Sequence, residues 1–104
     1  MAKLGNTKGE KAMRFELGQQ TATQGIVNAV SESEEFSKEV VTAFRRYISG
    51  DWGDIYPEDK ELNENAIKYG GSRIFAAYKT SKGKIYIITE WDRSYTTFLF
   101  ADEY

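Results

Sequence analysis

The sequence contains no cysteine and no histidine. Without cysteine the chain can form no disulfide bond, and it offers no thiolate as a nucleophile or as a zinc ligand. Without histidine it lacks the commonest transition-metal ligand and the side chain that most often transfers protons near neutral pH. These two absences exclude most mechanisms of small enzymes. We therefore expect a protein that is not an enzyme, with no catalytic residue, no metal and no cofactor.

A strong charge of one sign is also lacking, since 14 basic residues face 16 acidic ones and the formal net charge is −2. A nucleic-acid-binding domain usually carries a basic excess, and a mimic of nucleic acid would carry a large acidic one. Both functions are disfavoured. No apolar run approaches the ~20 residues that span a membrane, and no signal-peptide pattern opens the chain. We expect a soluble cytoplasmic protein that does not bind a membrane.

What the sequence does contain fits one globular domain. The 104 residues are 40% hydrophobic and 14% aromatic, a composition that disordered chains do not have. Residues 1–12 are polar, include two glycines and show no apolar periodicity, so we predict a flexible N-terminal tail. Residues 13–104 are predicted to form the single domain.

The first half of this domain is predicted to begin with a strand and to continue in helices. Apolar residues alternate with charged ones from Met13 to Leu17, which predicts a short strand that Gly18 ends and that joins a sheet edge. Thr21 or Thr23 is placed to cap a short helix. Ser31, followed by Glu34 three residues later, predicts the start of a longer helix.

That longer helix carries one apolar stripe and is predicted to end near Gly50. The stripe consists of Phe36, Val40, Phe44, Tyr47 and Ile48. Pro57 is typical of the first position of a further helix, which Gly70 and Gly71 would end. Three residues are predicted to share the buried face of that helix: Leu62, Ala66 and Tyr69.

After Gly71 the apolar period changes to two, which predicts strands over residues 73–80, 84–90 and 95–100. Short loops join them, so they should form a three-stranded antiparallel meander. With two to three helices before it, the domain is predicted to be α+β. Ile85 would face the helices and Tyr86 the other side of the sheet. Two alternatives remain for that other side: a partner-binding surface, or a face covered by the N-terminal segment.

Two polar clusters are candidates for chemistry. Residues 90–93 (Glu-Trp-Asp-Arg) would be an acid–base pair or metal site, or a charged turn, and the lack of a third ligand nearby favours the turn. Residues 51–54 (Asp-Trp-Gly-Asp) have the composition of a calcium loop but not its spacing, so a link between two helices is favoured.

A third possibility is a surface that binds another protein. Residues 31–64 carry ten acidic and four basic side chains, so this stretch either meets a basic partner or is simply a solvated helix face. Aromatic residues beside turns or at the chain end would anchor a partner, because Tyr and Trp are enriched among interface hot spots. The candidate partner-binding residues are Asp51, Trp52, Asp54, Glu90, Trp91, Asp92, Arg93 and Tyr104.

A string of motifs gives the chain a family resemblance over about residues 13–104. It includes Ser49-Gly50-Asp51-Trp52-Gly53-Asp54, Glu58-Asp59-Lys60, Leu62-Asn63, Ser72-Arg73-Ile74, Ala76-Ala77-Tyr78, Lys84-Ile85-Tyr86-Ile87-Ile88-Thr89-Glu90, Asp92-Arg93-Ser94, Thr96-Thr97 and Asp102-Glu103-Tyr104. In these motifs the chain resembles small plasmid-related proteins of bacterial plasmids and integrative elements. The resemblance implies an accessory protein of a mobile genetic element that acts in the bacterial host cell.

In size and general likeness the chain is also similar to small type II-A anti-CRISPR proteins of Gram-positive mobile elements. This second resemblance implies that it binds and inhibits the host's Cas9 by hindering guide RNA loading. It carries no functional residue over to this chain. A net charge of −2 does not suit a DNA mimic, so we expect inhibition by occupation of a protein surface.

Overall fold

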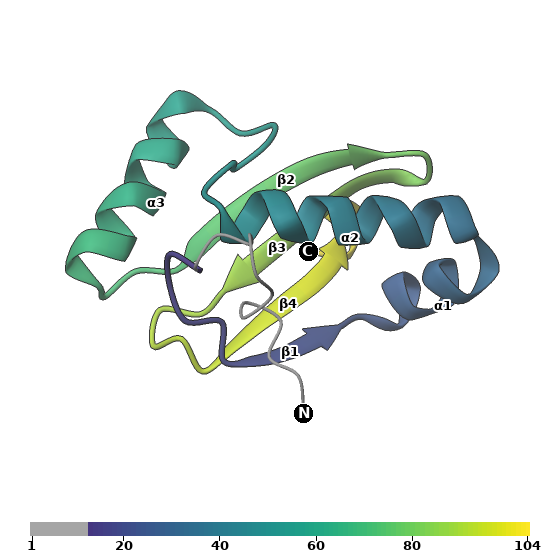
Figure 1. The fold of residues 1–104 in the computed structure, drawn as a ribbon, viewed down its shortest axis with the longest axis horizontal. Helices are drawn as coiled ribbons and strands as arrows, with labels where there is room; N and C mark the ends of the chain where they lie inside the picture. The colour runs from purple at the N-terminus through teal and green to yellow at the C-terminus, as the bar shows by residue number, and fades with distance from the viewer. Residues whose placement is uncertain (1–12) are drawn as a thin grey trace.

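The computed structural model describes residues 13–104, so the predicted tail at residues 1–12 lies outside the described residues. Three helices and a four-stranded sheet confirm the α+β class (Figure 1). The elements in chain order are β1 (Gln19–Ala22), α1 (Gln24–Glu32), α2 (Glu34–Ile48), α3 (Pro57–Tyr69), β2 (Ile74–Thr80), β3 (Gly83–Thr89), β4 (Tyr95–Phe100) and the 3-10 helix η2 (Ala101–Glu103).

The sheet has the strand order β1-β4-β3-β2. Strands β2, β3 and β4 form the predicted antiparallel meander, and β1 adds a parallel strand beside β4. The sheet is therefore mixed and has four strands. An N-terminal strand at the edge was expected, but its predicted position at residues 13–17 is wrong, because the strand begins at Gln19.

Gly18 explains this shift. Its φ is 63°, and a Cβ at this position would collide with the carbonyl oxygens of Arg93 and Ser94. Glycine therefore lets the chain pass close to the β3–β4 turn before it enters the sheet. The alternation ahead of it has another cause: Leu17 is buried, and the ring of Phe15 packs edge-on against Tyr47.

The predicted cap of the first helix is confirmed, and the predicted cap of the second is wrong by two residues. Thr23 caps α1, since its hydroxyl accepts a hydrogen bond from the Ile26 amide. The cap of α2 is Ser33 rather than the predicted Ser31, with the Phe36 amide donating to its hydroxyl. Ser31 lies inside the last turn of α1, where its hydroxyl donates to the Asn28 carbonyl.

The apolar stripe of α2 packs against the sheet, as predicted. Phe36 and Tyr47 are buried, and the Phe36 ring stacks on Phe100 of β4. Figure 1 shows α2 crossing one face of the sheet. Ile85 of β3 is fully buried with these residues.

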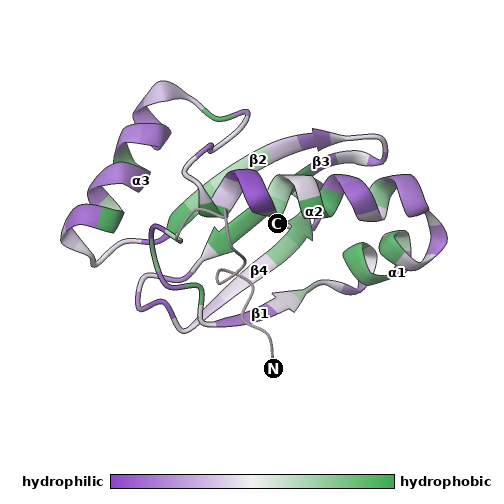
Figure 2. Cartoon of the chain, viewed as in Figure 1, coloured by the Kyte–Doolittle hydropathy of each residue, from purple (hydrophilic) through white to green (hydrophobic). Residues whose placement is uncertain are grey.

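The predicted buried face of α3 is only partly correct. Ala66 is buried, but Leu62 is 61% and Tyr69 73% exposed. The helix lies at the outer edge of β2 instead of on the sheet face, and the side chain of Asn63 bonds both backbone groups of Phe75. In Figure 2 hydrophobic residues run along β2, β3 and β4, whereas α3 is largely hydrophilic.

The second face of the sheet is not covered by residues 13–18, which pack on the helix side. Here Tyr86 contacts the rings of both Phe75 and Tyr104. The guanidinium of Arg73 donates to the hydroxyl of Tyr104. The C-terminal tyrosine therefore folds back over part of this face. No helix within residues 13–104 has the length and apolar character needed to cross a membrane.

Candidate protein-binding surface

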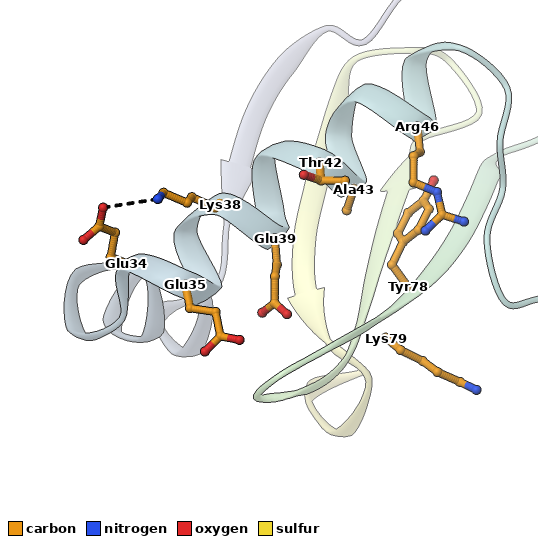
Figure 3. Close-up of a pocket in the computed structure, with 9 residues that line it drawn as sticks. All are labelled: Glu34, Glu35, Lys38, Glu39, Thr42, Ala43, Arg46, Tyr78 and Lys79. Atoms are coloured by element: carbon orange, nitrogen blue, oxygen red, sulfur yellow. Dashed lines mark ion pairs between the residues drawn. The ribbon is translucent and has the colours of Figure 1, made fainter.

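A pocket of about 550 Å³ lies between helix α2 and strand β2 (Figure 3), and we call it the α2–β2 pocket. Its walls come from α2 between Glu34 and Arg46 and from Tyr78 and Lys79 near the end of β2. The lining residues are Glu34, Glu35, Lys38, Glu39, Thr42, Ala43, Arg46, Tyr78 and Lys79.

One end of this pocket is acidic because the first turns of α2 carry glutamates, which the positive end of a helix dipole favours. Glu34 pairs with Lys38 at 3.4 Å, one turn further along. Glu39 accepts hydrogen bonds from the amide and the hydroxyl of Ser81, at 3.0 and 2.7 Å. This contact fixes Glu39 and ties the β2–β3 hairpin to the helix. Glu35 is exposed and forms no ion pair within residues 13–104.

The other end carries the basic side chains Arg46 and Lys79. The guanidinium of Arg46 lies 4.9 Å from the centre of the Tyr78 ring and donates to the Asp51 carboxylate at 2.8 Å. Tyr78 in turn donates to the Asp51 carbonyl at 2.7 Å. The Arg46 hydrogen bond holds the pKa of Asp51 below its usual value. Asp51, a predicted site residue, thus shapes this end of the pocket.

The remaining residues of the 51–54 cluster close the outer edge of β2. Trp52 is only 3% exposed, and its indole N–H donates to Glu64 at 2.9 Å. Trp52 therefore belongs to the core, and its side chain offers almost no surface to a partner in this conformation. Gly53 bridges Ala77, and Asp54 pairs with Lys84 at 3.3 Å. The cluster is the helix link that the sequence favoured.

The 90–93 cluster is the tight turn between β3 and β4. Asp92 accepts a hydrogen bond from the Ser94 amide at 3.0 Å. Hydrogen bonding to the side chain and then to the backbone of Ser94 lowers the pKa of this carboxyl. Arg93 points inward and donates to backbone carbonyls, including that of Ala66 at the end of α3. Trp91 is 62% exposed and remains a candidate anchor.

The structure does not bring the eight predicted site residues together. Asp51–Asp54 follow the edge of β2, residues 90–93 form the β3–β4 turn, and Tyr104 lies across the second sheet face with 67% exposure. The sequence reading missed Glu39 and Tyr78 as pocket residues. The acidic first turn of α2 was a visible signal, but its facing partner on β2 depends on tertiary packing.

The chemistry of this surface is that of charge pairing and aromatic contact. Among residues 13–104, on this surface and elsewhere, four carboxyls have a lowered pKa: Asp51, Glu64, Asp92 and Glu103. Each is stabilised in its charged form by a hydrogen bond, so each serves as an acceptor. Within residues 13–104 no group of three or more Asp or Glu side chains is placed to hold a metal ion.

Comparisons of the chain with protein-family models, with curated proteins and with solved structures found no match. The resemblance to plasmid-related proteins therefore rests on the sequence motifs alone, and the resemblance to anti-CRISPR proteins rests on size and general likeness alone.

Proposed function

We propose that this protein is a non-enzymatic inhibitor that binds type II-A Cas9 of a bacterial host and hinders guide RNA loading. The observation that carries the proposal is the excess of acidic side chains over residues 31–64, of which those in the first turns of α2 line one end of the α2–β2 pocket. Of the ten acidic residues between positions 31 and 64, several form no ion pair within residues 13–104. These are Glu32, Glu35, Glu39, Glu58, Asp59 and Glu61.

Such a surface suits a partner that normally holds nucleic acid. A protein groove that binds RNA carries many basic side chains, and opposite charges steer encounter and raise the association rate. Charge alone gives little lasting affinity, because exposed pairs are screened by salt beyond about 8 Å. Exposed aromatic residues would supply the rest, and Trp91 and Tyr104 are both more than 60% exposed.

The resemblance to plasmid-related proteins favours a second candidate. In this case the chain is an accessory protein of a plasmid or integrative element that binds another protein of its own element. A pull-down from a host that expresses Cas9 separates the two candidates. Recovery of Cas9, and more of it without guide RNA, supports inhibition, whereas recovery of only element-encoded proteins supports the accessory role.

The order of mixing tests the inhibitory step. We expect full inhibition of DNA cleavage when the protein meets apo-Cas9 first, and weak inhibition when guide RNA is loaded first. Equal inhibition in both orders contradicts an effect on loading. No binding to either form of Cas9 rules out Cas9 as the target.

A charge reversal tests the acidic surface in the same assay. Glu35→Lys places a positive charge at the pocket rim, and we expect a several-fold lower association rate with apo-Cas9 at low salt. Glu16→Lys is the matched control, because Glu16 is exposed and lies outside the acidic stretch. Equal effects of the two variants would show that the pocket rim has no special part in binding.

A further inference from the structure

Strand β1 leaves one side of its backbone without a partner among residues 13–104. The amides of Gln19 and Thr23 donate to Ser94 and Phe98 at 3.0 Å, toward β4. Because successive amides of a strand point to opposite sides, those of Gln20 and Ala22 point away from the sheet. All four residues of β1 are exposed, and none is charged or proline.

The opposite edge of the same sheet is closed. Ala77 of β2 accepts from the Asp54 amide at 2.7 Å and donates to the Trp52 carbonyl at 3.3 Å. Asn63 occupies both backbone groups of Phe75. Native sheets usually protect their edges in this way or with charged side chains. The edge of β1 has neither form of protection in the described part of the chain.

An apolar groove of about 330 Å³ runs beside this edge, between β1, β4 and α2, and we call it the β1 groove. Gln20 of β1 and Phe98 of β4 line the groove from the sheet. Val41, which is 48% exposed, lines it from α2. The lining residues are Gln20, Val40, Val41, Phe44, Arg45, Ile48 and Phe98. Arg45 is the one charged residue among them, and it forms no ion pair within residues 13–104.

We propose that the β1 edge binds an extended strand of a partner protein whose alternate side chains are apolar and which carries a carboxylate opposite Arg45. An added strand would bond the outward backbone groups of Gln20 and Ala22. Its side chains on the helix side would fill the β1 groove and cover Val41. The carboxylate follows from charge complementarity, since the groove offers one cation and no lining acid. This docking mode does not depend on Cas9 being the target.

A library of displayed linear 12-residue peptides, selected on the purified full-length chain, tests the proposal without a known partner. We expect enrichment of peptides that alternate apolar and polar residues and contain an acidic residue. A synthetic copy of an enriched peptide should slow hydrogen exchange at the amides of Gln20 and Ala22. No enrichment, enrichment without alternation, or no slowing at these two amides overturns the proposal.

Variants locate the bound peptide on the protein. Ala22→Pro removes an outward N–H and leaves the bonds to β4 in place, which an edge strand tolerates. We expect at least tenfold weaker peptide binding from Ala22→Pro and from Val41→Glu. Leu62→Glu is the matched control for Val41→Glu, because Leu62 is an exposed apolar residue on α3, 61% accessible against 48% for Val41. Circular dichroism confirms that each variant is folded, and an effect of Leu62→Glu equal to that of Val41→Glu overturns the placement.

Two further experiments complete the test: a charge reversal at Arg45, and measurements on the protein without peptide. Arg45→Glu should weaken the acidic peptide and strengthen a copy in which lysine replaces the acid, whereas a parallel loss for both peptides contradicts the carboxylate contact. A dimer in sedimentation that Ala22→Pro converts to a monomer would assign the edge to a second copy. Slow exchange at Gln20 and Ala22 in the free monomer would assign it to the chain itself, and either result overturns the proposal.

Discussion

Arg93 is the residue whose role changes most between the sequence and the structure. It is the one non-glycine residue with a positive φ in the described part of the chain, at 60°. Its guanidinium donates to the carbonyls of Ser72, Glu90 and Ala66 at 2.7, 3.0 and 2.9 Å. These bonds join the end of α3, the start of β2 and the β3–β4 turn. Because its guanidinium is used in these bonds, the Arg93 side chain stabilises the fold and is not available to pair with a partner.

We therefore expect Arg93→Lys to destabilise the protein. Lysine keeps the charge but cannot reach three carbonyls with one planar fork. Since a hydrogen bond to a charged group contributes about 1.5–3 kcal/mol, the free energy of unfolding should fall by about that amount. Urea denaturation at pH 7 measures the change. Arg45→Lys is the control, as Arg45 is exposed and makes no such bonds, and an equal stability of the two variants would refute the assigned role.

At the scale of the elements, the junction between α1 and α2 makes a prediction about two serines. Ser33 is the single residue between the helices, and its hydroxyl accepts from the Phe36 amide at 3.1 Å. Removing such a cap costs about 1 kcal/mol. We expect Ser33→Ala to lower the free energy of unfolding by this amount, and Ser31→Ala to have a clearly smaller effect because its bond is exposed. Thermal or urea denaturation of both variants would decide, and the reverse order would place the cap at Ser31.

Periodicity in the sequence predicted some elements well because their packing repeats along the chain. On the side that faces the helices, the three strands of the meander bury every second residue over most of their length. Helix α2 packs its stripe against them at steps of three to four, so local pattern and structure agree there. The site could not be predicted in the same way. The α2–β2 pocket joins Glu39 to Tyr78 across the fold, and no local pattern pairs these two positions.

The N-terminal strand and the buried face of α3 were predicted wrongly, because they depend on tertiary contacts that leave no periodic pattern in the sequence. Phe15 and Leu17 alternate because both reach the core from a segment without a strand partner. Asn63, a polar residue, binds α3 to β2. The prediction considered only apolar residues and therefore placed Leu62 and Tyr69 on the buried face, although both are exposed. In each case a tertiary contact overrode the local preference.

At the scale of the whole molecule, a buried chain of hydroxyls connects its layers. The Tyr47 hydroxyl of α2 shares a hydrogen bond with Thr89 at 2.8 Å, and Thr89 shares one with Thr96 at 2.7 Å. Thr96 then donates to the carbonyl of Leu17, also at 2.7 Å. The chain thus links α2, β3, β4 and the segment before β1. Within residues 13–104 no buried side-chain polar atom lacks a partner, so this network carries no penalty for unsatisfied groups.

A second connection, on the surface, makes the stability of the whole domain depend on pH. Glu64 of α3 accepts from the guanidinium of Arg14 at 2.6 and 3.0 Å and from the indole of Trp52 at 2.9 Å. The Arg14 hydrogen bond is the main cause that lowers the pKa of Glu64 below its usual 4.5. Three segments distant in the chain are thereby joined by one carboxylate.

The sign of the pH effect follows from this lowered pKa. In the unfolded chain Glu64 binds a proton more readily than in the folded one, so its stabilising effect is complete above about pH 4.5. The effect is lost as the pH falls through the lower pKa of the folded state. Glu64→Gln should therefore reduce the loss of stability between pH 7 and pH 3 by up to about 1 kcal/mol, since the pair is partly exposed and screened.

Urea denaturation at both pH values measures this difference, and Glu61→Gln is the matched control. Glu61 is exposed on the same helix and forms no ion pair within residues 13–104. Because Glu61→Gln removes a carboxyl without breaking a contact between segments, its loss of stability in acid should equal that of the unchanged protein. A Glu64→Gln variant as acid-sensitive as the control would show that the link between Arg14, Trp52 and α3 does not stabilise the fold.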